Sequence, residues 1–82
     1  MSRIRVLVVE DEESFAEALN VGLGREGFEI ELVGDGIAAI DAFNQKQPDV
    51  VLLDVMLPGL SGIDVCREIR NRSDVPIIMV TA

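Results

Sequence analysis

The sequence contains no His, Trp or Tyr, and its only aromatic residues are three Phe among 82 residues. Because 49% of the residues are hydrophobic, the core must be built from aliphatic side chains, and at this length it must be small. The single cysteine, Cys66, excludes an internal disulfide and a cysteine-based zinc site, which suits a reducing compartment. Cys66 lies in the middle of a predicted helix, so we interpret it as a packing residue rather than a redox centre.

Basic residues are scarce as well: 7 Lys and Arg stand against 15 Asp and Glu, for a net charge of −8. A chain this acidic has no basic surface for nucleic acid or for an anionic membrane, and cations are its favoured ligands. The chain begins Met-Ser-Arg-Ile-Arg and enters its first apolar run at once, and no run approaches the length of a membrane span. We therefore expect neither a signal peptide nor a membrane segment, and a cytoplasmic location.

The most informative stretch extends from Val50 to Gly59, where four apolar residues run into Asp54 and then into a Pro-Gly turn. Consecutive apolar residues, half of them β-branched, are typical of a strand that is buried on both faces. In parallel α/β sheets, ligands bind beyond the carboxyl ends of the strands. The position of Asp54 therefore favours a chemical role for its carboxylate.

Hydrophobic periodicity divides the chain into alternating strands and helices. Strands are predicted at residues 4–9, 28–33, 50–54 and 77–80, and helices at residues 14–26, 37–43 and from residue 61 onward. Polar residues alternate in the second strand, which indicates an edge strand, whereas the fourth strand is apolar throughout and is predicted to be buried. Asp35 is the predicted N-cap of the second helix, and Gly27 ends the first. The series predicts a parallel sheet with right-handed crossovers.

Three of the predicted strands end in polar groups: Glu10 and Asp11 follow the first, Asp54 the third and Thr81 the fourth. Because parallel strands end at the same edge of a sheet, these groups should lie in one crevice. Carboxylates this close raise one another's pKa unless a cation neutralises them. An oxygen-only donor set predicts a hard ion such as Mg²⁺, beside which Asp54 could attack a phosphoryl group.

Each of these residues also has a purely structural interpretation. The acids from Glu10 to Glu13 could complement the dipole of the helix that follows. Asp54 could be a turn-forming residue before Pro58, and Thr81 could simply be a β-branched strand residue. Their coincidence at the ends of the right strands is what favours a site.

Three ordered blocks resemble the receiver domain of bacterial two-component response regulators. They are Val-Val-Glu-Asp-Glu at 8–12, Leu-Leu-Asp-Val-Met-Leu-Pro-Gly-Leu-Ser-Gly at 52–62 and Val-Pro-Ile-Ile-Met-Val-Thr-Ala at 75–82. The Glu-Asp-Glu and Met-Leu-Pro-Gly motifs are similar to those of the OmpR/PhoB subfamily. The sequence around Asp-Val-Cys-Arg resembles that of actinobacterial phosphate-starvation regulators. The resemblance implies an α/β, flavodoxin-like doubly wound parallel sheet with strand order 2-1-3-4.

The resemblance also implies roles for individual residues. Asp54 would be the aspartate that a sensor histidine kinase phosphorylates, and the domain would assist this reaction without being a turnover enzyme. Mg²⁺ would be held by Asp11 directly, by Glu10 largely through water, by Asp54 and by the backbone carbonyl of Met56. Thr81 would be the switch hydroxyl that turns toward the phosphoryl group.

Three further residues match the family pattern. Ala82 would leave room for the switch hydroxyl, and Pro58 and Gly62 would shape the loop at the rim of the site. Beyond them the family pattern continues, so residues 1–82 are predicted to be the N-terminal part of a receiver domain. The fifth strand, the last two helices and the Lys that contacts the phosphoryl oxygens are absent. A winged-helix output domain, through which DNA would be bound, is absent too.

Two other functions compete with phosphoacceptor signalling. The chain could have lost its signalling function and self-associate, as a homodimer or larger assembly, through an open sheet edge. It could instead be a Mg²⁺-dependent phosphatase with an aspartyl-phosphate intermediate. That enzyme class would place a second Asp where this chain has Met56, which argues against it.

Overall fold

The computed structural model describes residues 3–80, and these form seven elements in the predicted order of strands and helices. The elements are β1 (Arg5–Val9), α1 (Glu13–Arg25), β2 (Glu29–Val33), α2 (Gly36–Gln45), β3 (Val50–Asp54), α3 (Gly62–Arg70) and β4 (Ile77–Val80). None of the helices in this range is long and apolar enough to cross a membrane.

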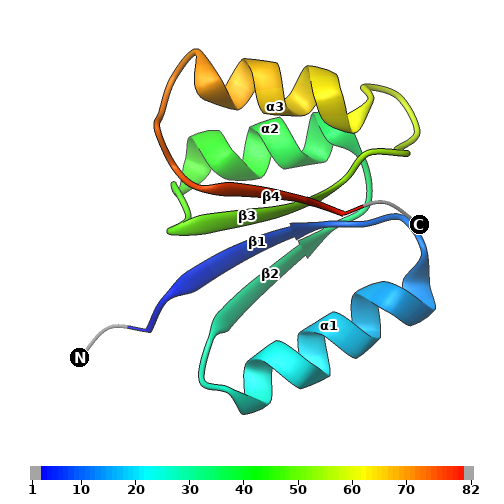
Figure 1. The fold of residues 1–82 in the computed structure, drawn as a ribbon, viewed down its shortest axis with the longest axis vertical. Coiled ribbons are helices and arrows are strands. Elements are labelled where there is room, and N and C mark those ends of the chain that lie inside the picture. The colour runs from blue at the N-terminus through cyan, green and yellow to red at the C-terminus, as the bar shows by residue number, and fades with distance from the viewer. Residues whose placement is uncertain (1–2, 81–82) are drawn as a thin grey trace.

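The strands form one sheet in the order β2-β1-β3-β4, and every pair is parallel. The register aligns Val8 of β1 with Leu32 of β2 and with Leu52 of β3, which in turn pairs with Ile78 of β4. Figure 1 shows α2 and α3 on one face of the sheet and α1 on the other. The predicted flavodoxin-like α/β fold, its strand order and the edge position of β2 are confirmed.

The main hydrophobic core lies between the sheet and the α2–α3 pair. Leu7 and Leu53 point into it from the two central strands, and both are almost fully buried. Phe43 of α2 and Ile69 of α3 close it from the helix side. Apart from Phe43 the buried members are aliphatic, as the shortage of aromatic residues predicts.

The opposite face and the β4 edge are much less covered. Ala16 is the only buried residue of α1, and Phe15 remains 40% exposed. In β4, Ile78 is 54% and Met79 is 39% exposed. The prediction that the fourth strand is buried is therefore wrong for the described part of the chain. There β4 pairs only with β3, so its side chains have a neighbouring strand on one flank alone.

The helix ends follow the local sequence signals. The Asp35 carboxylate accepts a hydrogen bond from the Ala38 backbone N–H at 2.7 Å, which confirms the predicted N-cap of α2. Ser61 caps α3 in the same way through the Asp64 N–H. Gly27 directly follows Glu26, the C-cap of α1, and adopts φ 96°. This left-handed conformation favours glycine and confirms the predicted end of the helix.

Candidate metal centre at the carboxyl ends of the strands

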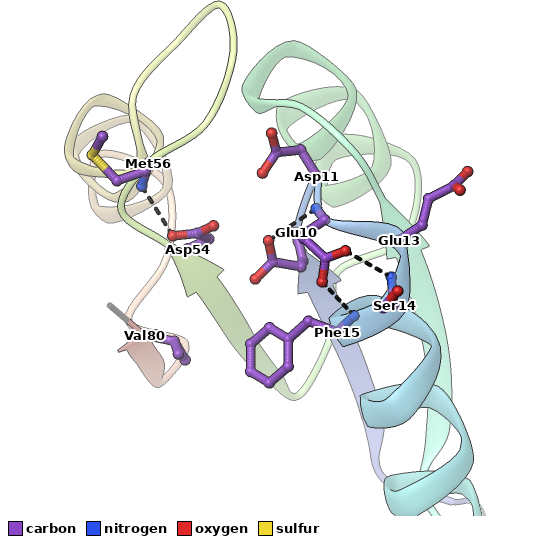
Figure 2. Close-up of a pocket in the computed structure, with 9 residues that line it drawn as sticks. Glu10, Asp11, Glu13, Ser14, Phe15, Asp54, Met56 and Val80 are labelled. Atoms are coloured by element: carbon purple, nitrogen blue, oxygen red, sulfur yellow. Dashed lines mark hydrogen bonds between the residues drawn. The ribbon is translucent and has the colours of Figure 1, made fainter. Parts of the chain in front are cut away.

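A crevice of about 890 Å³ opens where the central strands end. Figure 2 shows acidic side chains pointing into it from the segment after β1 and from the last residue of β3, opposite the apolar side chains of Phe15 and Val80. Its lining comprises Glu10, Asp11, Glu12, Glu13, Ser14, Phe15, Asp54, Met56 and Val80. The crevice therefore combines an acidic floor with a partly apolar wall.

Three of the predicted site residues converge on this floor. Glu10 and Asp11 follow β1 directly and Asp54 is the last residue of β3, and one carboxylate oxygen from each lies within 4.8 Å of the others. Glu10 and Asp54 are each only 8% exposed, whereas Asp11 is exposed to solvent. The pairing of β1 with β3 brings these residues together, because parallel neighbours end at the same edge.

The electrostatic state of Glu10 reflects this crowding. Burial raises the pKa of the Glu10 carboxyl above its ordinary value, and the nearby carboxylates of Asp54 and Asp11 raise it further. A hydrogen bond from the Glu12 backbone N–H acts in the opposite direction and lowers the pKa. A raised carboxyl pKa is the expected result where acids gather without a neutralising cation.

Asp54 is held in place by the loop that follows it. Its Oδ1 accepts a hydrogen bond from the Met56 backbone N–H at 3.0 Å, drawn as a dashed line in Figure 2. The residue after Asp54 is held to β4, because the Val55 N–H donates to the Val80 carbonyl at 3.2 Å. The Asp54 carboxylate is thus oriented by backbone contacts.

Glu12 has a role that the sequence analysis did not separate from its neighbours. Its carboxylate accepts hydrogen bonds from the backbone N–H groups of Ser14, at 3.1 Å, and Phe15, at 2.8 Å, and so forms the N-cap of α1. Its own N–H donates to Glu10 Oε2 at 3.1 Å. The structural interpretation of the acidic run is therefore correct for Glu12, while Glu10 and Asp11 face the crevice. Glutamate is not one of the residues usually preferred at an N-cap, so this role becomes visible only in the backbone geometry at the start of α1.

The remaining predicted residues are divided between the site and its surroundings. Thr81 and Ala82 lie outside the described residues. Pro58 lines a separate hollow with Asp35, Ile37 and Gly59. Gly62 lies against the backbone of Asp54, where a β-carbon would collide with the Asp54 carbonyl oxygen.

The donor set fits a hard divalent cation. Three carboxylates whose oxygens lie this close together repel one another unless a positive charge lies among them, and oxygen ligands suit Mg²⁺. An acidic site at the carboxyl ends of a parallel sheet places the molecule among α/β domains that bind their ligands at this edge.

Comparison with known proteins identifies which of these domains it is. Residues 6–82 match the response regulator receiver domain family. The chain is 58% identical over 77 residues to sensory transduction protein RegX3 of Mycolicibacterium smegmatis, covering 94% of this chain and 34% of that protein. It is 54% identical over 80 residues to the DNA-binding response regulator MtrA of Mycolicibacterium paratuberculosis, covering 98% and 36%. The chain belongs to the response regulator receiver family.

Solved structures of response regulators share the fold of this chain. The receiver domain of Francisella response regulator 1452 superimposes with a TM-score of 0.93 at 27% identity, over 98% of this chain and 67% of that one. The complex of histidine kinase ThkA with response regulator TrrA contains a match with a TM-score of 0.89 at 42% identity, over 95% and 68%.

These findings confirm the resemblance to OmpR/PhoB-type actinobacterial response regulators. Receiver domains are signalling domains of two-component systems, and they bind Mg²⁺ at an acidic pocket of the kind formed by Glu10, Asp11 and Asp54. The chain spans about a third of the length of the curated relatives it matches.

Proposed function

We propose that this chain accepts a phosphoryl group on Asp54 from the phosphohistidine of a sensor histidine kinase, in a reaction that requires Mg²⁺. The observation that supports this most directly is the convergence of Asp54 with Glu10 and Asp11 within 4.8 Å at the carboxyl end of the sheet. A nucleophilic carboxylate beside two further acids suits phosphoryl transfer, in which catalysis consists mainly of positioning and charge neutralisation.

In the transfer step, a carboxylate oxygen of Asp54 forms a bond to phosphorus while the P–N bond to the kinase imidazole breaks. The electron pair of that bond returns to the imidazole nitrogen, which takes up a proton. The hydrogen bond from the Met56 N–H to Oδ1 orients the Asp54 carboxylate for this attack. Because Asp54 is only 8% exposed, its surroundings limit the access of competing water.

The metal would be held by Asp11 and Asp54, by the Met56 carbonyl, and by Glu10 largely through water. When bound, Mg²⁺ supplies the positive charge that three carboxylates and the incoming phosphoryl oxygens require. Glu12 supports this set indirectly, because its N–H fixes Glu10 Oε2 while its carboxylate caps α1.

The wider function is proposed from the family. A sensor histidine kinase would be the phosphoryl donor, and the solved complex of TrrA with histidine kinase ThkA supports such a partner. Thr81 would provide the switch hydroxyl, with Ala82 leaving room for it. The phosphorylated receiver would control DNA binding by a winged-helix domain, in keeping with the DNA-binding relative MtrA. Residues 1–82 would be the N-terminal part of that receiver domain.

The intact mass of the chain after incubation with acetyl phosphate and Mg²⁺ tests the proposal. The natural chain should gain the mass of one phosphoryl group, and EDTA should abolish this gain. Asp54→Asn should remain unlabelled, because it removes the attacking carboxylate oxygen. Asp41→Asn is the matched control, since Asp41 is exposed on α2 and its side chain makes no hydrogen bond or ion pair within residues 3–80. Labelling that persists in Asp54→Asn, or that is absent from the natural chain, would contradict the proposal.

Self-association is the second candidate function. The observation that favours it is the β4 edge, where Ile78 is 54% exposed and, among residues 3–80, the strand pairs only with β3. An unpaired apolar strand edge promotes pairing between chains. Sedimentation equilibrium over a range of concentrations should then reveal a dimer that Ile78→Lys weakens. A monomer at every concentration would exclude this candidate.

A further inference from the structure

Gly36, the first residue of α2, lies directly against the loop that connects β3 to α3. Gly36 is buried, and a β-carbon at this position would lie 2.6 Å from the Leu60 carbonyl oxygen and 2.7 Å from Leu60 Cβ. It would also lie 2.8 Å from Val65 Cγ2. Because the nearest atom belongs to the backbone, a rotamer change cannot relieve the contact. Glycine at this position permits the close approach of the two chain segments.

The loop that Gly36 contacts carries Met56, the residue that orients the proposed acceptor Asp54. It runs from Val55 to Ser61 and includes Met56, whose N–H holds Asp54 Oδ1 at 3.0 Å. Its two ends are joined, because the Gly62 N–H donates to the Val55 carbonyl at 3.0 Å. A loop closed on itself in this way transmits a displacement at Leu60 toward Met56.

Packing also limits how the loop can respond. Leu57 and Leu60 are partly buried and pack against the core under α2 and α3. The loop therefore cannot move outward at Leu60 without losing apolar contacts that stabilise its present position. A side chain at position 36 would force either this loss or a shift of the loop along the surface of α2.

We infer that Gly36 is a positioning residue for the acceptor site: by lacking a side chain, it sets the position of the loop that carries Met56 and thereby the geometry around Asp54. This inference rests on the proposed function for its biochemical meaning. Gly36 is not among the residues that line the crevice, so its effect would pass through Leu60 and the loop.

Gly34 provides a matched control in the same turn. It lies two residues before Gly36, is exposed, and a β-carbon there would meet no atom within 4 Å. Gly34→Ala and Gly36→Ala therefore add the same methyl group to the same connection, but only the second presses on the loop. A difference between the two variants reports the contacts that a side chain at position 36 makes with Leu60 and Val65, because a side chain at position 34 meets nothing.

The experiment has two readouts on the full 82-residue chain. The first is the amide resonances of Val55 and Met56 in metal-free protein, which should shift in Gly36→Ala and stay unchanged in Gly34→Ala. The second is the Mg²⁺ dissociation constant, which should rise about tenfold in Gly36→Ala. A loss of affinity of this size is usual when a residue that supports a metal ligand is disturbed. Circular dichroism at the same temperature establishes that each variant is folded.

Leu60→Gly disturbs the loop at the residue that Gly36 faces, by removing the Leu60 side chain that packs against the core. It tests the path from Leu60 to Met56 if Gly36→Ala does not fold. The inference predicts shifted Met56 amide resonances and weakened Mg²⁺ binding in this variant as well. Met56 resonances that remain unchanged in a folded variant, together with unchanged Mg²⁺ affinity, would overturn it. If the natural chain binds no Mg²⁺, the proposed function fails, but the metal-free amide comparison still decides whether Gly36 positions the loop.

Discussion

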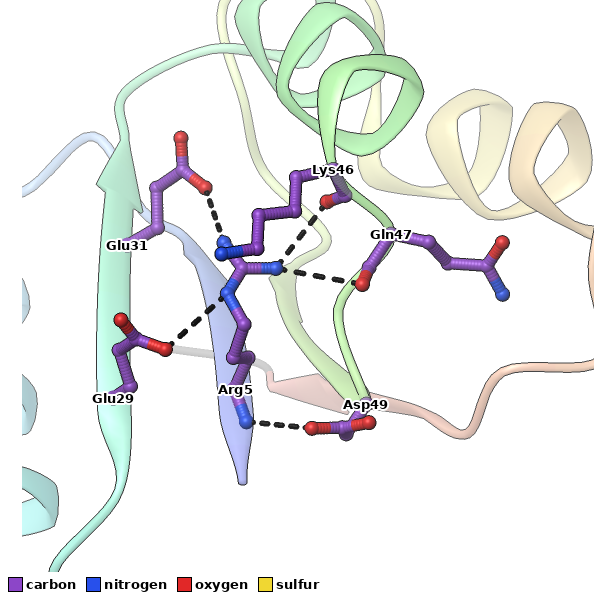
Figure 3. A network of polar contacts seen from close by, with 6 residues as sticks. All are labelled: Arg5, Glu29, Glu31, Lys46, Gln47 and Asp49. Carbon is purple, nitrogen blue, oxygen red and sulfur yellow. Dashed lines mark hydrogen bonds and ion pairs between the residues drawn. The ribbon is translucent and has the colours of Figure 1, made fainter. Parts of the chain in front are cut away.

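The two ends of the sheet each gather three carboxylates, but they treat them in opposite ways. At the amino end, Arg5 lies among Glu29, Glu31 and Asp49 (Figure 3). Its guanidinium forms ion pairs with Glu29 at 3.4 Å and Glu31 at 3.3 Å, while its backbone N–H donates to Asp49 Oδ2 at 2.7 Å. At the carboxyl end, Glu10 and its two acidic neighbours converge, and none of the ion pairs found within residues 3–80 reaches them.

At the amino end, the cation that faces the acids is a side chain of the protein itself. The Arg5 side chain is only 17% exposed, and its Nη1 also donates to the carbonyls of Lys46 and Gln47, which follow the end of α2. The chain thus supplies its own cation where the acids serve stability. At the carboxyl end, where the acids are proposed to hold Mg²⁺, no ion pair within residues 3–80 reaches them, and burial together with the neighbouring carboxylates raises the pKa of Glu10. Acidic clusters in one molecule can therefore be told apart by whether the chain neutralises them.

The largest expected effect is stabilisation by Mg²⁺, which would make the carboxyl end resemble the amino end. At about a hundredfold excess over its dissociation constant, a ligand that binds only the folded state raises the free energy of unfolding by about 2.7 kcal/mol. Urea unfolding with Mg²⁺ or with EDTA, at matched ionic strength, measures this. Asp11→Asn should lose most of the gain. An equal gain in that variant would mean that Mg²⁺ acts elsewhere on the acidic surface.

Arg5→Met should destabilise the chain by about 2 kcal/mol, because it leaves the partly buried Glu31 carboxylate and the carbonyls of Lys46 and Gln47 without their donor. Mg²⁺ affinity should not change, since Arg5 lies at the other end of the sheet. Thermal unfolding and a Mg²⁺ titration measure the two quantities. Arg25→Met, an exposed arginine at the end of α1, is the control and should have little effect on either. A fall in Mg²⁺ affinity with Arg5→Met would show that the two ends of the sheet do not act independently.

Asp54→Asn should have the opposite effect on stability in the absence of metal, raising the free energy of unfolding by about 1 kcal/mol through relief of charge repulsion. The asparagine retains an oxygen that can accept the hydrogen bond from the Met56 N–H. Urea unfolding in EDTA, beside Asp41→Asn, isolates the effect from the change in net charge. Destabilisation greater than in the control would show that the acid at position 54 is held by attractive contacts instead.

The smallest effect concerns pH. Because the pKa of Glu10 is raised in the folded chain, the folded state holds more protons than the unfolded state between the ordinary and the raised value. Metal-free stability should therefore fall as pH rises through this window. Glu10→Gln should remove this part of the slope. Urea unfolding in EDTA at a series of pH values, for both chains, gives the difference. Parallel curves would mean that Glu10 ionises in the folded chain as it does in the unfolded one.

Part of the site was predictable because it depends on local pattern. Asp54 follows an apolar run, and Glu10 and Asp11 follow another, so the rule that parallel strands end together placed them in one crevice. Thr81 stays a prediction, because it lies outside the described residues. Glu12 was grouped with its neighbours because a run of acids does not reveal which member caps the helix. That assignment requires the backbone geometry at the start of α1.

The sequence by itself determined the elements, their order and the acids at the strand ends, because hydrophobic period and turn residues act over a few neighbouring positions. Only the tertiary structure decided what distant segments do to one another. It surrounded Arg5 with Glu29, Glu31 and the end of α2, exposed Ile78 at the sheet edge, and placed Gly36 against Leu60. The physical reason is that burial, ion pairing and close backbone approach depend on which surfaces meet after folding.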